Sequence, residues 1–243
     1  MALTTNLNVY YKLDGNSNEA VGGTLNGTDT AITYSAGNGI IVQGAGFNGT
    51  TSKIVFTDNA SFKPTGNFSV NMWLKMNSNG TGGTLGLFQS YAQPGTVAGF
   101  AIEQYNTTNK LRFYSGKNTG VTLGTDFQDL TSASAISSAA FQMWTMVYNG
   151  SNLLIYLNGN STPDASVAWT NGPAYAATNY VRMGCADTAG TDGSFNSGAI
   201  DEVGLWSRAL STSEISQLYN GGAGFQYPFV TSTTGAAFLL GMI

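Results

Sequence analysis

Hydrophobic and polar residues alternate along several short segments of this chain, most regularly over residues 68–76. In "FSVNMWLKM" every second side chain is apolar, and these positions are Phe68, Val70, Met72, Leu74 and Met76. Because successive side chains of a strand point to opposite faces, this pattern predicts a strand with one buried face. Similar runs predict further strands at 9–13, 53–56, 99–105, 111–115, 142–149, 153–158, 180–185 and 200–206.

Turn signals separate these segments. Asn-Gly pairs recur along the chain, and such pairs favour tight reversals in which the backbone needs a positive φ. The segment "WTMVYNGSNLLIYLNG" predicts a hairpin, because two hydrophobic runs flank the polar turn at 149–152. Short strands without helical periodicity between them predict an all-β fold, a sandwich of two antiparallel sheets.

One helix is expected, over residues 212–220. Ser211 and Glu214 have the spacing of a capping box, and Leu210 and Ile215 that of a hydrophobic staple. Gly221 is expected to supply the left-handed residue that ends the helix. With Ile215, Leu218 and Tyr219 on one apolar stripe, the helix should form a lid on the sandwich.

No linker is visible before residue 225, so we expect one domain over 1–225 and an apolar tail over 226–243. The tail ends in "AAFLLGMI", which is too short to span a bilayer. We expect it either to pack on the domain or to dock into a neighbouring subunit through Phe238, Leu239 and Leu240.

Charge and composition exclude several functions. Nine basic and thirteen acidic residues give a net charge of −4, and the basic residues are scattered, so a nucleic-acid partner is not expected. The absence of histidine excludes histidine-based catalysis. Cys185 is the single cysteine, so no disulfide forms within the chain. Neither a secretory signal nor a membrane span is apparent in the sequence.

Several segments together carry a resemblance to a known family. These are "YYKLDGNSNEAVGGTLNGT", "GAGFNGTTSKIVF", "GNFSVNMWLKM", "WTMVYNGSNLLIYLNG" and "GAIDEVGLWSRALSTSEISQLYNGG". In this order and spacing the chain resembles laminin-G-like, concanavalin A-like domains over about residues 7–222. The resemblance implies a two-sheet antiparallel jelly-roll sandwich that binds carbohydrate or protein, as found in phage virion proteins, adhesins and carbohydrate-binding modules. Such a fold does not by itself decide the function.

The adjacent carboxylates of Asp201 and Glu202 are the first candidates for chemistry. Neighbouring positions of a strand point to opposite faces, so the pair does not fit the two facing carboxylates of a glycosidase, and we expect no catalytic residues. In one interpretation both acids are polar residues paired with Arg208 or with lysines. In the other, Asp201 and Asp14 hold a structural Ca²⁺, as similar jelly rolls often do, with oxygens from "LDGNSNEA" completing the shell.

Aromatic residues in loops are the candidates for sugar binding, because an exposed ring can stack on the apolar face of a sugar. Trp73, Trp144 and Trp206 lie within strand patterns and are expected to be structural. Trp169, Tyr175 and Tyr91 are the candidate platform residues, although packing within loops or against another subunit is the alternative.

These observations lead to two functional hypotheses. The first is a non-enzymatic virion surface protein that decorates a phage capsid or tail, attaches to capsid or tail subunits or to itself, and contacts cell-surface glycans. The second is a carbohydrate-binding or adhesin module of a bacterial cell-surface protein. The expected location is the virion surface or the extracellular space.

Overall fold

The alternation over 68–76 forms a central strand of a two-sheet sandwich in the computed structural model, which describes residues 1–79, 83–92, 95–187 and 191–230. Sheet A has eight strands. Seven follow the order β13 (Ala165–Ala168), β12 (Asn152–Leu157), β11 (Gln142–Tyr148), β6 (Phe68–Met76), β17 (Ser197–Trp206), β4 (Gly44–Asn48) and β3 (Thr33–Ser35). The eighth, β1 (Leu7–Tyr11), pairs with the second half of β17, while β4 pairs with its first half.

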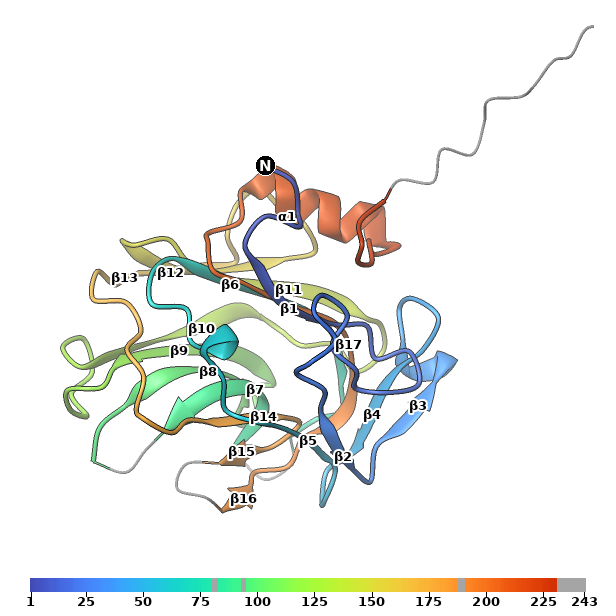
Figure 1. Ribbon diagram of the computed structural model, residues 1–243, viewed down its shortest axis with the longest axis horizontal. Coiled ribbons are helices and arrows are strands. Elements are labelled where there is room, and N and C mark those ends of the chain that lie inside the picture. The colour runs from blue at the N-terminus through green and yellow to red at the C-terminus, as the bar shows by residue number, and fades with distance from the viewer. Residues whose placement is uncertain (80–82, 93–94, 188–190, 231–243) are drawn as a thin grey trace, which may run out of the picture.

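Sheet B faces sheet A across the core (Figure 1). Its seven strands follow the order β10 (Phe127–Ala135), β9 (Lys110–Lys117), β8 (Ala98–Tyr105), β7 (Thr84–Ala92), β14 (Tyr180–Met183), β5 (Lys53–Phe56) and β2 (Thr28–Thr30). A small hairpin of β15 (Ala186–Asp187) and β16 (Asp192–Gly193) lies beside β7. All pairings between strands are antiparallel, which confirms the predicted all-β sandwich.

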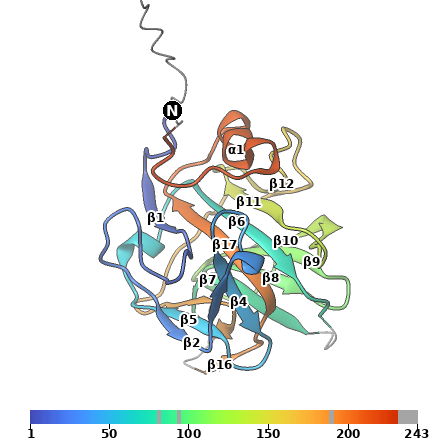
Figure 2. The same ribbon diagram turned by 90° about the vertical axis from the view of Figure 1, so that its right-hand side faces the viewer.

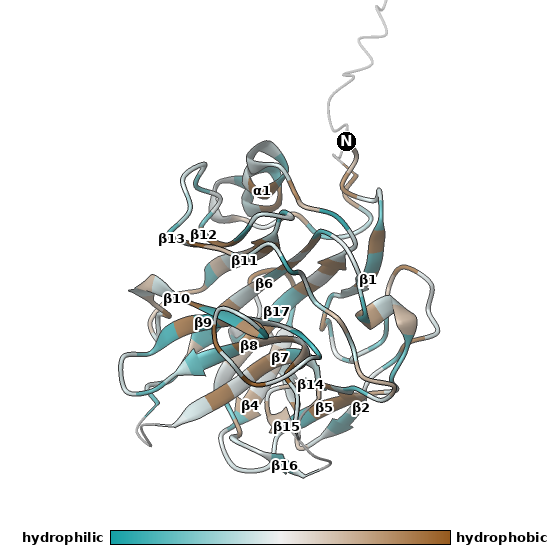
Figure 3. Cartoon of the chain, turned by 90° about the vertical axis from the view of Figure 1, so that its left-hand side faces the viewer, coloured by the Kyte–Doolittle hydropathy of each residue, from teal (hydrophilic) through white to brown (hydrophobic). Residues whose placement is uncertain are grey.

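The core lies between the two sheets and is filled by the inward side chains of the alternating strands. Phe68 packs against Phe100 and Phe113 from the opposite sheet, with ring centroids 5.3 and 5.8 Å apart. In Figure 3 brown and teal segments alternate along the strands of sheet B, as expected for strands with one buried face. Trp73, Trp144 and Trp206 are at most 2% exposed, so their predicted structural roles are confirmed.

Helix α1 (Thr212–Tyr219) covers the outer face of sheet A, the side away from sheet B (Figures 1 and 2). Tyr219 stacks on Trp73 of β6 with ring centroids 5.6 Å apart, and Ile215 and Leu218 are buried in the same cluster. The Ser211 and Glu214 capping box forms as predicted. The left-handed residue at the end of the helix is Asn220 rather than the predicted Gly221, although Gly221 also has a positive φ.

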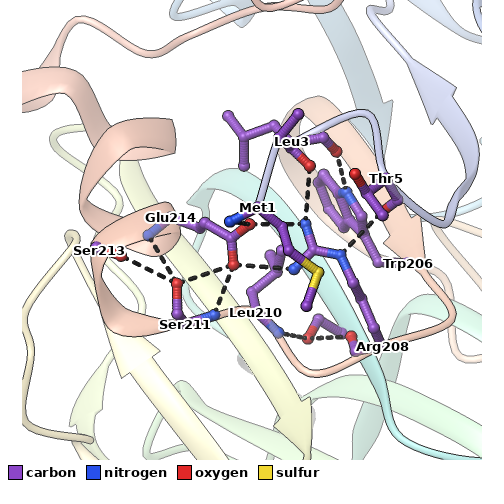
Figure 4. Close-up of polar contacts among 11 residues, drawn as sticks. Met1, Leu3, Thr5, Trp206, Arg208, Leu210, Ser211, Ser213 and Glu214 are labelled. Carbon is purple, nitrogen blue, oxygen red and sulfur yellow. Dashed lines mark hydrogen bonds and ion pairs between the residues drawn. The ribbon is translucent and has the colours of Figure 1, made fainter.

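A buried ion pair joins the helix to the start of the chain (Figure 4). Arg208 donates from both terminal nitrogens to the Glu214 carboxylate, at 2.8 and 2.9 Å, and also donates to the carbonyls of Ala2 and Thr5. Trp206 donates from its indole nitrogen to the carbonyl of Leu3 at 2.6 Å. The lid helix therefore also anchors the N-terminal segment.

Among the described residues no helix is long and apolar enough to cross a membrane.

Candidate functional site

The outer face of sheet B carries the first candidate site. On β8, β9 and β10 the residues Ile102, Phe113 and Leu130 point into the core, whereas the alternate positions Glu103, Arg112 and Asp129 point away from it. Glu103 lies directly opposite Arg112, and Asp129 lies opposite Tyr114 on the same strand as Arg112. Because directly opposed residues share a face, three neighbouring strands bring these side chains together. Helix α1 lies on the other sheet and leaves this face uncovered (Figure 1).

Arg112 is held in one position at the centre of this face. Its Nε and Nη2 donate to the same Glu103 oxygen at 2.9 and 2.6 Å, and Nη1 lies 3.7 Å from an Asp129 oxygen. The guanidinium carbon lies 4.8 Å from the ring centre of Tyr105 and 5.4 Å from that of Tyr114. Burial raises the pKa of Glu103, while the charge of Arg112 opposes that rise. These contacts fix polar groups beside aromatic rings.

An aromatic cluster borders Arg112. Tyr114 lies between Tyr91 and Phe127, with centroid distances of 5.9 Å to the edge-on Tyr91 and 4.7 Å to the stacked Phe127. Tyr114 and Phe127 are partly exposed, and Tyr91 is 7% exposed. Burial raises the pKa of Tyr114 to about 12, so its hydroxyl is neutral and able to donate a hydrogen bond. Flat rings beside fixed polar groups suit a sugar, which has apolar faces and hydroxyl edges.

The predicted loop platform does not form as expected. Trp169 is 3% exposed and belongs to the main core, and Tyr175 packs against the same core. Trp169 therefore has no free face for stacking on a sugar, whereas the role of the partly buried Tyr175 stays a prediction. Tyr91, the third predicted residue, instead lies on β7 at the outer face of sheet B. The residues that the sequence did not indicate are Tyr114, Phe127 and Arg112, which have ordinary strand patterns and meet only through the pairing of their strands.

A second candidate site is an acidic cluster under the C-terminal segment. Asp14 accepts hydrogen bonds from the Gln43 amide at 3.0 Å and from the Gln226 side chain at 2.8 Å. The same Gln226 nitrogen donates to Glu202 at 2.6 Å, and the Tyr10 hydroxyl donates to the other Glu202 oxygen. Asp14 and Glu202 thus lie within reach of one amide nitrogen.

Asp201 lies next to this cluster and is held by the backbone amides of residues 40–41. Its Oδ2 accepts from the amides of Ile40 and Ile41 at 2.8 and 3.3 Å, whereas the buried Oδ1 has no partner among the described residues. Burial, together with the charges of Glu202 and Asp14, raises the pKa of Asp201 to about 9. Burial also raises the pKa of Glu202 to about 8. At neutral pH Asp201 and Glu202 are therefore protonated unless a cation binds beside them.

The prediction that Asp201 and Glu202 point to opposite faces is wrong. A β-bulge interrupts the pairing of β17 with β6 between Asp201 and Gly204, and Glu202 has a φ of 50°. This extra residue breaks the alternation and lets both carboxylates gather near Asp14. Arg208, the predicted partner, pairs with Glu214 instead. Both acids are at most 1% exposed.

The chemistry of this cluster fits Ca²⁺, which prefers carboxylate and carbonyl oxygens. The unpartnered Asp201 oxygen favours a cation there, because a cation would allow the neighbouring buried acids to ionise. However, among the described residues no three acidic or cysteine side chains converge as ligands of a metal ion. Calcium binding by Asp14 and Asp201 therefore stays a prediction.

The tail residues Phe238, Leu239 and Leu240 lie outside the described residues.

Comparisons with known proteins agree with this architecture. A family model described as the concanavalin A-like lectin/glucanases superfamily, of the laminin-G type, matches residues 48–216. No curated protein matches the chain. Domain 4 of AbnA, an extracellular GH43 arabinanase from Geobacillus stearothermophilus solved with arabinotriose, is similar at a TM-score of 0.64 and 19% identity, covering 87% of this chain and 97% of that domain.

Toxin binding domains share the same fold. The binding domain of paraclostridial mosquitocidal protein 1 is similar at a TM-score of 0.70 and 16% identity, over 90% of this chain and 52% of that one. The binding domain of botulinum neurotoxin DC, solved with SialylT, is similar at 0.62 and 13% identity, over 89% and 51%. This chain therefore spans about half the length of those binding domains. Since the family model covers more than half of the sequence, the chain belongs to the laminin-G-like branch of the concanavalin A-like lectin/glucanase superfamily.

Proposed function

We propose that this chain is a carbohydrate-binding module that acts outside the cell, as in the second of the two hypotheses, and that the outer face of sheet B holds the glycan. The observation that carries the proposal is the cluster of Tyr91, Tyr114 and Phe127 beside the fixed Arg112. Aromatic rings would stack on the sugar, while Arg112 and its carboxylate partners would bond its hydroxyls. Similarity to an arabinanase domain solved with arabinotriose supports a saccharide as the ligand.

Calorimetry of the purified chain, first with arabinotriose and then with the hits of a glycan array, tests this proposal. Tyr114→Ala and Phe127→Ala should each weaken binding about five- to tenfold, since a lost aromatic stack costs about 1–1.4 kcal/mol. Tyr219→Ala is the matched control, because it removes a partly buried tyrosine from the opposite side of the sandwich. Equal affinities in all three variants would contradict the sheet B site.

We propose binding without hydrolysis. Glu103 and Asp129 are the carboxylates near the aromatic cluster, and both interact with Arg112 rather than standing free as an acid and a nucleophile. The family description nevertheless includes glucanases, so a reducing-sugar assay belongs with the binding experiment. Release of reducing ends that Glu103→Gln abolishes would replace this proposal with an enzymatic one.

The virion-surface hypothesis stays a prediction. It relied on the family resemblance, on the low charge of the chain and on the apolar end of the tail, which lies outside the described residues. The structures named above are an enzyme domain and toxin domains. Mass spectrometry of purified particles tests it directly, because a virion subunit should be present at stoichiometric copy number.

A further inference from the structure

A row of side chains crosses the part of sheet A that helix α1 does not cover. Thr33 of β3 lies opposite Gly46 of β4, Gly46 lies opposite Ala199 of β17, and Ala199 lies opposite Lys75 of β6. Directly opposed residues of neighbouring strands share a face. The adjacent row along the strands, which consists of Ala45, Ile200 and Leu74, points into the core. Because successive residues of a strand alternate between faces, the row from Thr33 to Lys75 points outward. Figure 2 shows β4, β17 and β6 from this side.

The small residues in the middle of this row leave a hollow of about 360 Å³ between Thr33 and Lys75. Asn38, from the turn before β4, closes one side and donates to the Thr33 carbonyl at 3.1 Å. A Cβ at position 46 would lie only 2.3 Å from the Asn38 side chain. The Asn38 side chain can therefore occupy this position only because residue 46 is a glycine. Asn48, Asn77 and Ser138 line the remaining wall.

The hollow is positively charged. Lys75 donates to the Gly37 carbonyl at 2.8 Å, and its ammonium lies 4.7 Å from the ring centre of Phe141. No carboxylate pairs with Lys75 among the described residues, and no acidic residue lines the hollow. An ammonium has three N–H donors, so two remain for a ligand. The Oδ1 atoms of Asn38 and Asn77 accept no hydrogen bond from described residues and are available to hydroxyl groups.

We propose that this hollow binds an acidic sugar unit whose single carboxylate pairs with Lys75. The volume falls in the range of small-molecule sites, which is about 300–1,000 Å³. One ammonium matches one carboxylate, the amides of Asn38 and Asn77 match sugar hydroxyls, and the short side chains of the floor leave room for a flat ring. This site is separate from the glycan face of sheet B, which lies on the other sheet.

Titration of the ¹⁵N-labelled chain with trigalacturonic acid, followed by NMR, tests the proposal. The amides of residues 38, 75 and 199 should shift, and the fully methyl-esterified trisaccharide, which has the same shape without the charge, should bind at least tenfold more weakly. Lys75→Met should weaken binding of the acid about tenfold or more, whereas Lys75→Arg should retain most of the affinity. Methionine and arginine both keep the apolar stem of the side chain, but only arginine keeps the positive charge. Lys117→Met, which removes the same charge from the end of β9 in sheet B, should leave the affinity unchanged.

Three outcomes would overturn the proposal. These are no binding at 10 mM ligand, equal binding of the acid and its methyl ester, or equal weakening by Lys75→Met and Lys117→Met. The shifts of residues 38, 75 and 199 are followed separately from those of residues 112 and 114, so a failure of this site and a failure of the sheet B site are distinguishable.

Discussion

Asp201 buries a carboxylate with one oxygen that no described group hydrogen-bonds. Burying a charge without a partner costs several kcal/mol, so such groups normally take up a proton or bind a cation. The neighbouring carboxylates of Glu202 and Asp14 make an added negative charge still less favourable. Either a proton or a metal ion must therefore satisfy this cluster in the folded protein.

We expect calcium to stabilise the domain through this cluster. At a concentration a hundred times the dissociation constant, a bound ion adds about 2.7 kcal/mol to the free energy of unfolding, or roughly 5–10 °C of melting temperature for a chain of this size. Thermal melts of the dialysed chain with EGTA, with 10 mM CaCl₂ and with 10 mM MgCl₂ measure the effect.

Asp201→Asn should abolish the calcium-dependent rise, because the amide removes the anionic ligand while keeping the shape of the side chain. Asp126→Asn, in the turn before β10, removes the same charge elsewhere and should leave the rise intact. A melting temperature of the parent chain that does not respond to calcium would exclude the metal site.

Single residues were predicted well where local rules govern them and poorly where they do not. The capping box of Ser211 and Glu214 is such a local rule, whereas the predicted joint role of Asp14 and Asp201 in binding calcium stays a prediction. The sequence could not reveal the bulge at Glu202, because a bulge depends on pairing with the partner strand. Trp169 was assigned to a loop from its neighbours, but its burial depends on how that loop folds onto the core.

At the scale of the element, helix α1 shows how far local signals extend. The capping box lies within four residues, so both hydrogen bonds could be assigned before any tertiary contact was known. Glu214 has a second role that the sequence did not indicate, which is the ion pair with Arg208. Burial alone would raise the pKa of Glu214, but hydrogen bonds from Arg208 and Ser211 outweigh it and lower the pKa from 4.5 to about 2.

Stability should therefore depend on the ionisation of Glu214. Because the folded-state pKa lies below the unfolded value, the contribution is complete above about pH 4.5 and is lost as the pH falls toward 2. Glu214→Gln should lower the free energy of unfolding by about 2–3 kcal/mol at pH 7, since the side chain is 7% exposed and one pKa unit is worth about 1.4 kcal/mol. Urea unfolding between pH 2.5 and pH 7 measures this difference.

Leu218→Ala provides the control for that experiment. It loosens the same helix by removing buried apolar contacts, which costs about 2–5 kcal/mol at any pH. A Glu214→Gln difference that stayed constant across the pH range, as expected for Leu218→Ala, would show that the ion pair does not contribute through its charge.

Several strands were missed for a physical reason that is visible in their composition. β4 reads "GAGFN" and β2 reads "TDT", so neither has the run of bulky residues that marks a half-buried strand. In β7 a bulge between Gly86 and Phe88 shifts the alternation part way along the strand. These strands are defined by hydrogen bonding to their neighbours, whereas β6 could be predicted from the alternation of apolar and polar residues in its own sequence.

On the scale of the whole molecule, the N-terminal segment and the last described residues, 225–230, both pack on sheet A. The N-terminal segment is bonded to Trp206 and Arg208, and the C-terminal segment places Tyr227 and Phe229 against the Tyr10 ring at 6.0 and 5.3 Å. The two proposed ligand sites lie apart from these segments, one on sheet B and one around β4 of sheet A. Neither was apparent from the sequence, because each surface combines residues of strands far apart in the chain.

The length of the C-terminal segment should decide how stable the sandwich is. Residues 226–230, which the sequence assigned to the tail, include Gln226, bonded to Asp14 and Glu202, and Phe229, packed on Tyr10 and Trp206. A chain that ends at residue 230 should therefore be more stable than one that ends at residue 225, by about 2–4 kcal/mol. This is the cost expected for losing the packing of one aromatic side chain and the hydrogen bonds of one side-chain amide. Both chains lack residues 231–243, so the difference in their urea midpoints reports on residues 226–230 alone.

Phe229→Ala in the chain ending at 230 should reproduce about half of this loss of stability, because it removes the contacts with Tyr10 and Trp206. Val230→Ala, whose side chain is largely exposed, should have no effect. Equal midpoints for the two truncated chains would show that this segment lies on the sandwich without stabilising it.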